Sequence, residues 1–206
     1  MQLDIAITRN AFPAMIHLEF DVVTDDLLMW KGQVVMSRSE EAYFERIFEH
    51  FACLRQQSVL EIGFGLGISA RLIQKYLRPV EHDIVEIESQ VFRNLEEFSL
   101  THASVRPIAG DWKKIPGEGN YDFIFYDPYD YVCDESPDDA RSVAALKLKS
   151  LLKPSGILCH PHFGDGDVPD IAGFETIIVE RLTVAPISMA DGTTCSDVAV
   201  VYHRSD

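Results

Sequence analysis

The chain has 206 residues, about the length of one domain. Hydrophobic residues make up 47% and charged residues 25%, a composition typical of a folded globular protein and not of a disordered one. The 18 Lys and Arg residues against 33 Asp and Glu residues give a formal net charge of −15. Phosphate backbones and anionic lipids bind clustered basic residues, so we expect neither a nucleic-acid nor a membrane partner.

Cysteine usage and the terminal segment favour a cytoplasmic protein. None of Cys53, Cys133, Cys159 and Cys195 belongs to a C-x-x-C pair, and a chain of this size needs no disulfides. The first residues lack the charged and apolar blocks of a signal peptide, and no apolar run is long enough to span a membrane. We therefore predict reduced thiols and a cytoplasmic location.

The first part of the chain predicts a strand, a turn and a helix. Residues 15–23 alternate between apolar and polar side chains, as a strand does. Lys31 and Gly32 separate two apolar runs within residues 27–36 and predict a turn. Ser37 and Glu40 fit a capping box that opens a helix over residues 38–53.

The rest of the chain alternates strands and helices. Expected strands lie at 58–62, 82–87, 105–108, 121–126 and 156–160, with helices at 68–77, 89–102 and 138–152. This rhythm predicts an α/β fold with a doubly wound, mostly parallel, Rossmann-like sheet. Two long β-rich runs, 174–184 and 196–203, predict an antiparallel C-terminal hairpin at one edge, which gives seven strands. We divide this single domain into a cap, residues 1–56, which contributes to the substrate site, and a core, residues 57–206.

A glycine loop follows the first core strand and carries Gly63, Gly65 and Gly67. The dinucleotide fingerprint G-x-G-x-x-G would need a glycine where Ile68 stands. Glu61 would also repel the pyrophosphate of such a cofactor. S-adenosylmethionine has an ammonium group and a sulfonium and no phosphate, so the loop predicts this cofactor.

The next two strand ends support the same ligand. Glu86 is placed to accept hydrogen bonds from the ribose hydroxyls. Asp111 can accept from the adenine amino group while Trp112 covers one face of the base. We add Ile87 and Met36 to the predicted cofactor site. The series of strand-end motifs resembles the class I S-adenosylmethionine-dependent methyltransferases over residues 58–160.

Asp127, Pro128 and Tyr129 follow the fourth core strand, so Asp127 should face the methyl donor. The sequence is similar to the Asp/Asn-Pro-Pro-Tyr signature of methyltransferases that act on planar amino nitrogens. The alternative is a proline turn with no chemical role. Asp127 also opens an acidic run, with Asp130, Asp134, Glu135, Asp138 and Asp139, which is either a solvated loop or a site that attracts a cation.

Residues 31–40 resemble a segment of guanidinoacetate N-methyltransferase and its arginine-methylating relatives, which carry Gly-x-x-Val-Met-x-x-Trp-Glu. The resemblance extends over about residues 25–160. In that family the glutamate of this pattern and the aspartate after the fourth strand grip the substrate guanidinium. Glu40 and Asp127 match those positions, and the resemblance implies a small cationic guanidino or amino acceptor for methyl transfer to nitrogen.

The implied chemistry is coherent, because a guanidinium presents a planar fork of N–H donors to carboxylates. We expect Asp127 to orient the acceptor and take its proton, with Glu40 as the second catalytic arm and Tyr129, Trp30 and His162 as further substrate contacts. The alternative for Glu40 is that it only caps its helix.

Three departures from the family leave the acceptor open between arginine, another guanidino compound and a different amine. Ser39 replaces the usual Trp, and Pro128 replaces a Thr. The region after the fifth strand is short, with the helix expected there reduced to residues 164–173.

Further alternatives concern function and assembly. His160 and His162 are candidate bases, but no ligand set has metal-site spacing, so we expect no metal. Competing functions are a natural-product O- or N-methyltransferase and a non-catalytic cofactor-binding module. Residues before Glu40 are candidates for a lid or a homodimer contact.

Overall fold

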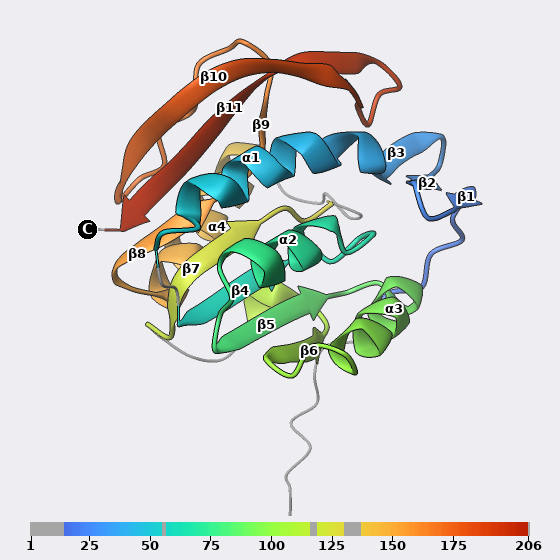
Figure 1. Ribbon diagram of the computed structural model, residues 1–206, viewed down its shortest axis with the longest axis horizontal. Helices are drawn as coiled ribbons and strands as arrows, with labels where there is room; N and C mark the ends of the chain where they lie inside the picture. The colour runs from blue at the N-terminus through green and yellow to red at the C-terminus, as the bar shows by residue number, and fades with distance from the viewer. Residues whose placement is uncertain (1–14, 55–56, 116–118, 130–136, 206) are drawn as a thin grey trace, which may run out of the picture.

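The computed structural model describes residues 15–54, 57–115, 119–129 and 137–205 (Figure 1). Its main sheet has the strand order β10-β11-β8-β7-β4-β5-β6, and the short strand β9 (His162–Phe163) pairs with β11. Five strands run parallel, namely β4 (Ser58–Ile62), β5 (Glu81–Glu86), β6 (Val105–Ala109), β7 (Tyr121–Tyr126) and β8 (Leu152–Cys159). The antiparallel hairpin of β10 (Phe174–Ser188) and β11 (Thr194–Ser205) forms the edge. The predicted fold class is confirmed, with β9 as an addition.

Helices cover both faces of this sheet. They are α1 (Glu41–Phe51), α2 (Ile68–Tyr76), α3 (Ser89–Ser99) and α4 (Pro137–Leu151), with 3-10 turns η1 (Arg38–Glu40) and η2 (Trp112–Lys114). Successive strand residues point to opposite faces, so Val59 belongs to one hydrophobic cluster and Leu60 to the other. The first cluster contains the apolar faces of α1, α2 and α3, and the second contains Leu148 and Leu151 of α4. In Figure 1, α1 and α2 accordingly lie in front of the sheet and α4 behind it.

A separate antiparallel sheet precedes α1 and consists of β1 (Val22–Val23), β2 (Leu27–Trp30) and β3 (Gln33–Ser37). Lys31 (φ 50°) and Gly32 (φ 75°) form the predicted turn, with both residues in the left-handed region that a two-residue hairpin requires. Leu28 and Met36 belong to the same cluster as α1–α3. The division at residue 56 stays a prediction.

Residues 15–23 do not form the predicted strand. Only Val22–Val23 pair as β1, whereas Ile16 makes an isolated bridge to Glu88. The Ile16 N–H donates to the Ile87 carbonyl at 3.0 Å, and the Ile16 carbonyl accepts from the Ser89 N–H at 2.9 Å. The alternating pattern therefore reflects a segment attached to the β5–α3 connection, which no local periodicity distinguishes from a strand.

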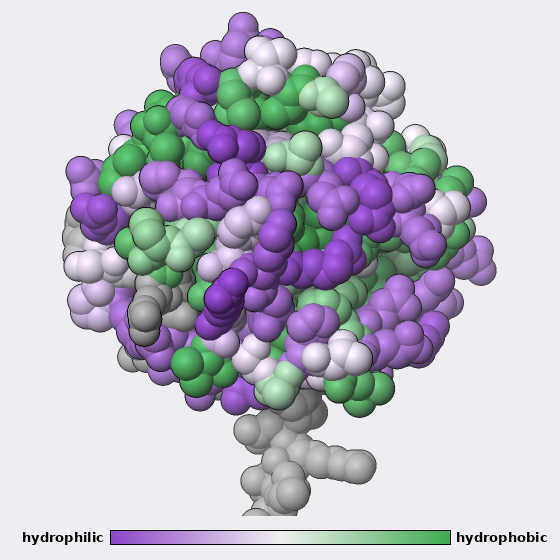
Figure 2. Space-filling model, viewed as in Figure 1, coloured by the Kyte–Doolittle hydropathy of each residue, from purple (hydrophilic) through white to green (hydrophobic). Residues whose placement is uncertain are grey.

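The connections around β8 also differ from expectation. Residues 164–173 form no helix, and β8 begins at Leu152 instead of residue 156 because Leu152 already pairs with Tyr121. Ser155 (φ 61°) lies within an irregular stretch between this pair and the Phe123–Ile157 pair. None of the helices in the described residues is long and apolar enough to cross a membrane. Hydrophilic residues dominate the face shown in Figure 2, with hydrophobic ones in scattered patches.

Candidate active site

The site lies at the carboxyl ends of the parallel strands, where β4 has β5 on one side and β7 on the other. The chain adds β5 and β6 on one side of β4 and then β7 and β8 on the other side. A crevice opens beyond the strand ends where the strand order reverses in this way. A cavity of about 190 Å³ occupies it. Nine predicted site residues line the cavity: Met36, Gly63, Gly65, Glu86, Ile87, Asp111, Trp112, Asp127 and Tyr129.

The glycine loop needs its glycines for space as well as for backbone conformation. Gly63 has φ 91°, and a Cβ there would lie 2.6 Å from the Asp127 carbonyl oxygen. Gly65 has φ 52°, and its Cβ would collide with the Met36 sulfur, which also accepts from the Leu66 N–H at 3.2 Å. Gly67 (φ 67°) precedes α2 against the Phe64 ring and lies outside the cavity lining. The first two glycines thus let the loop backbone pass close to Asp127 and Met36, and both line the cavity.

Glu86 ends β5 with its carboxylate fixed by backbone donors. Oε1 accepts from the N–H groups of Ile87 and Glu88, both at 2.8 Å, and Oε2 accepts from the Phe64 N–H at 3.0 Å. Burial raises the pKa of Glu86, and these backbone donors oppose that rise. A fixed carboxylate on the cavity wall suits a ligand with hydroxyl donors, such as a ribose.

Asp111 and Trp112 occupy the end of β6. Asp111 caps η2 by accepting from the Lys113 N–H at 2.9 Å, and its other oxygen lies 3.8 Å from the Lys114 ammonium. The buried Trp112 ring meets Tyr126 edge-to-face, with centroids 5.3 Å apart. An acceptor beside a rigid aromatic ring suits a purine.

Glu61 is buried behind the loop and does not line the cavity. Its Oε1 accepts from the Ser69 hydroxyl, and its Oε2 lies 3.0 Å from His82 Nε2. Both oxygens therefore face groups of the protein itself. A direct contact between Glu61 and the cofactor ammonium stays a prediction.

Glu40 is buried and does not line the cavity, but it lies close enough to Asp127 for the charge of Asp127 to affect its pKa. Burial and the charge of Asp127 raise the pKa of Glu40 to about 8, against the hydrogen bond from the Ser37 N–H. Burial, with the charge of Glu61, raises the pKa of Asp127 to about 7. No Lys or Arg among the described residues contributes to either shift. Glu40 and Asp127 are thus two neighbouring acidic groups whose pKa shifts have no contribution from a described Lys or Arg.

The remaining predicted substrate contacts divide into two groups. The Tyr129 hydroxyl donates to the Gln33 side chain, and the rings of Tyr129 and Trp30 meet edge-to-face with their centroids 6.5 Å apart. Both residues therefore lie at the β2–β3 side of the cavity. His162 lies outside the lining, with Nε2 3.3 Å from the Gly166 carbonyl and its N–H donating to Tyr43. Its contact with a substrate stays a prediction.

Several lining residues were not among the predicted site residues: Ile16, Val35, Ile62, Val85, Gly110, Lys113 and Pro128. All of them except Ile16 are sequence neighbours of a predicted residue, so widening each motif by one residue would have found these six. Ile16 has no such signal, because only its bridge to Glu88 brings it to the cavity.

The family model for guanidinoacetate N-methyltransferase matches residues 14–165, well over half of the chain. The chain belongs to the guanidinoacetate N-methyltransferase family. The resemblance seen in the sequence is thereby confirmed, and with it the expectation of an S-adenosylmethionine-dependent enzyme that methylates nitrogen. The cavity fits this cofactor, since its lining includes loop glycines, strand-end acids and an aromatic wall. Lys113 is the only basic residue among the described lining, as expected for a cofactor without phosphate.

Solved structures share the fold at low identity. The N-methyltransferase NodS from Bradyrhizobium japonicum, solved with S-adenosylhomocysteine, is 15% identical with a TM-score of 0.60, covering 82% of this chain and 86% of that one. The 1,6-didemethyltoxoflavin-N1-methyltransferase of Burkholderia thailandensis, also with S-adenosylhomocysteine, is 17% identical with a TM-score of 0.55, covering 81% and 80%. Spermidine synthase from Thermotoga maritima is 13% identical with a TM-score of 0.60, covering 87% and 64%.

Proposed function

We propose that this member of the family methylates a nitrogen of a small cationic guanidino or amino compound, with Glu40 and Asp127 holding the acceptor. The observation that supports the proposal is that Asp127 lines the cavity and the buried Glu40 lies near enough for the charge of Asp127 to raise its pKa. Like charges in a partly buried region raise each other's proton affinity. A bound cation relieves that repulsion, so the pair is arranged to receive one.

A guanidinium fits the pair better than a point charge does, because its N–H donors form a planar fork that matches carboxylate oxygens. Glu40 is fixed by its hydrogen bond from the Ser37 N–H, and Asp127 by the strand end of β7. These two fixed carboxylates would accept hydrogen bonds from the substrate and hold one of its nitrogens in line with the methyl donor. Orientation of this kind contributes several kcal/mol, within the range of about 7–11 kcal/mol for well-placed reactants.

When bound, S-adenosylmethionine would supply an electrophilic methyl group, whose bond to the sulfonium sulfur breaks as the bond to the acceptor nitrogen forms, with S-adenosylhomocysteine as the leaving group. Proton transfer is the task of the protein, since a guanidinium nitrogen has no free lone pair until a proton leaves. Asp127 in its ionised form accepts that proton as the new C–N bond forms. Its pKa of about 7 places it near the operating pH, where a general base works well.

The test is incubation of the protein with S-adenosylmethionine labelled in the methyl group. The acceptors would be guanidinoacetate, arginine, agmatine and methylguanidine, together with primary amines and phenols of similar size. We expect label in at least one guanidino compound or amine. Transfer only to hydroxyl acceptors would indicate the alternative of a natural-product O-methyltransferase. Cofactor binding without transfer to any compound or cell extract would indicate a non-catalytic module.

Asp127→Asn separates cationic from neutral acceptors. The amide keeps the shape but loses the charge and most of the basicity, so a guanidinium should lose its rate. A hydroxyl or neutral amine should tolerate the change better. An equal effect on both kinds of acceptor would contradict the cation-holding role.

A further inference from the structure

A second cavity, of about 370 Å³, adjoins the glycine loop. Its lining comes from the β1–β2 segment, from loop residues 64–66 and from the first half of α2 and of α3. In Figure 1, β1, β2 and α3 lie together on the right-hand side of the molecule. Of the described residues, only Gly65 lines both this cavity and the one assigned to the cofactor. The second cavity is therefore a separate space that touches the same loop.

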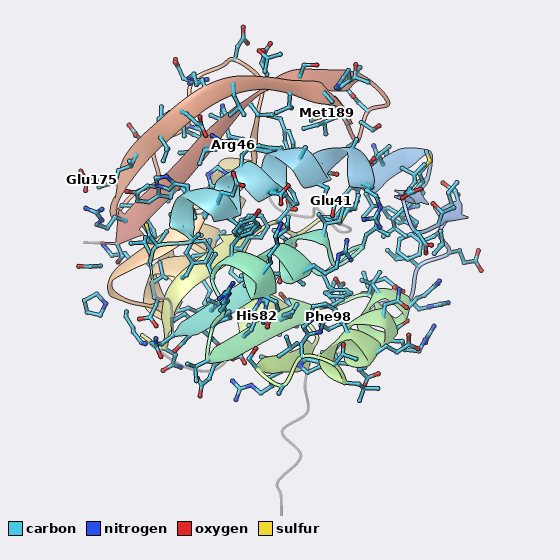
Figure 3. The ribbon with its side chains drawn as sticks, in the orientation of Figure 1. Glu41, Arg46, His82, Phe98, Glu175 and Met189 are labelled. Carbon is cyan, nitrogen blue, oxygen red and sulfur yellow. The ribbon has the colours of Figure 1, made fainter. Side chains whose placement is uncertain are left out.

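The buried part of its lining is apolar and well fixed. Leu28, Phe64 and Val91 are each no more than 4% exposed. The Phe64 ring packs against the ring of Phe98, which Figure 3 labels beside α3, with the centroids 5.6 Å apart. A Cβ at Gly67 would lie 2.8 Å from the Phe64 ring, so the loop backbone also packs closely against it. A preformed apolar wall of this kind suits the apolar part of a small molecule.

Two guanidinium groups line the cavity, and they differ in their partners. Arg38 pairs with the carboxylates of Asp26 and Glu41, at 2.7 and 3.2 Å. Arg71 is half-buried and makes one hydrogen bond within the described part of the chain, from Nη1 to the Leu66 carbonyl at 3.1 Å. Its Nη2 is buried and has no hydrogen-bond partner there. Arg71 thus brings a positive charge to the cavity without a described carboxylate to balance it.

The unbalanced Arg71 favours an anion, and the rest of the lining favours a carboxylate. A guanidinium can donate two parallel hydrogen bonds to one carboxylate. Gln90 and Asn94 of α3 add side-chain amides that can donate as well. Asp25 adds a negative charge, and no Lys lies among the described lining residues. A singly charged group therefore fits this lining better than a phosphate, which carries up to two negative charges near neutral pH.

We propose that this second cavity binds a small carboxylate with an apolar body. The carboxylate pairs with Arg71, and the apolar body packs against Leu28, Phe64 and Val91. The site is distinct from that of the methyl acceptor, and the proposal does not depend on which compound is methylated. The bound molecule would touch the loop that also forms part of the cofactor cavity.

The test is a titration followed by NMR shifts of the protein, with hexanoate, benzoate and 3-phenylpropanoate as ligands. The uncharged amides of the same acids and inorganic phosphate serve for comparison. We expect at least one carboxylate to bind at millimolar concentration or below. Its amide and phosphate should bind about tenfold more weakly or not at all, because the charged pair with Arg71 or the apolar contact is lost. Binding of none of the three carboxylates, or equally tight binding of the amide or of phosphate, would overturn the proposal.

Arg71→Gln should weaken binding of the carboxylate about tenfold or more and leave binding of the amide unchanged. Arg93→Gln is the matched control, because Arg93 is exposed on α3 and does not line the cavity, so the same charge is removed elsewhere. Equal losses in both variants would indicate a general effect of charge and overturn the site. If Arg71→Gln does not fold, Asn94→Trp adds bulk at an exposed position of the lining and should block the carboxylate. Unchanged affinity in Asn94→Trp would overturn the proposal.

Competition with the cofactor product separates the two cavities. The carboxylate should still bind when the protein is saturated with S-adenosylhomocysteine, because the two ligands occupy different spaces. Displacement of the carboxylate by S-adenosylhomocysteine, together with weaker binding of this product to Arg71→Gln, would mean that Arg71 holds the carboxylate of the cofactor itself. That result would overturn the proposal. None of these measurements requires methyl transfer, so they stand apart from the test of the proposed function.

Discussion

Glu40 accepts a hydrogen bond from the Ser37 N–H at 2.9 Å and thereby completes the capping box that opens η1 and α1. The same carboxyl interacts with the charge of Asp127. The Glu40 side chain can therefore cap the helix and contribute to the site at the same time. The capping bond also holds the carboxyl in place, because it removes the rotational freedom that an exposed glutamate would have.

Glu40→Gln should keep the cap, since the amide oxygen still accepts from Ser37, but lose the charge beside Asp127. We expect kcat/KM for a cationic acceptor to fall about 100-fold or more, as for other lost orienting contacts. Thermal unfolding should change little below about pH 7, where the Glu40 carboxyl, with its pKa of about 8, still holds its proton. The neighbouring Glu41→Gln is the control: Glu41 is half-exposed, lies at the start of α1 (Figure 3) and pairs with Arg38 at 3.2 Å. Equal loss of activity in both variants would contradict a specific role for Glu40.

The stability of the protein should fall as the pH rises through the neutral range. The pKa of the Asp127 carboxyl is about 7 in the folded protein against an ordinary value of 3.8, so the folded state holds this proton more strongly than the unfolded state does. Its contribution to stability is complete below about pH 4 and is lost as pH rises through 7. Asp127→Asn should remove this loss and raise the free energy of unfolding at pH 9 by about 1 kcal/mol or more relative to the wild type. Denaturant unfolding at pH 6 and pH 9 checks it, and equal pH dependence in both proteins would refute it.

Gly63→Ala should disrupt cofactor binding. The added Cβ would meet the Asp127 carbonyl at 2.6 Å, and backbone cannot rotate away as a side chain can. We expect affinity for S-adenosylhomocysteine to fall by about tenfold or more, measured by calorimetry. Gly32→Ala is a matched control, because Gly32 also has a positive φ but its Cβ would meet nothing within 4 Å. Both variants should lose stability, and only Gly63→Ala should lose the ligand.

Tyr129→Phe removes the hydroxyl that donates to Gln33 and so releases one link between the β2–β3 hairpin and the end of β7. A partly exposed hydrogen bond contributes about 1 kcal/mol or less to stability. We expect KM for the acceptor to rise several-fold while affinity for S-adenosylhomocysteine stays the same. Gln33→Ala should reproduce the effect if the link matters. An unchanged KM in both would show that this side of the cavity does not contact the acceptor.

The sequence by itself determined the order of strands and helices, the capping box, the turn at Lys31–Gly32 and the glycine loop. These features depend on periodicity and turn chemistry within a few residues, and the structure reproduces them. The pattern of residues 15–23 misled for the same reason: periodicity shows which faces are apolar, whereas pairing depends on partners elsewhere in the chain.

Only the tertiary structure decided which strand-end residues meet. Met36 reaches Gly65, and Glu40 reaches Asp127, because the β1–β3 sheet and α1 pack onto the core through one shared cluster. Glu61 and Glu86 both read as strand-end acids in the sequence, yet Glu86 lines the cavity and Glu61 turns behind the loop toward His82. Successive residues of a strand point to opposite faces, and the packing of α2 against one face selects which acid is enclosed.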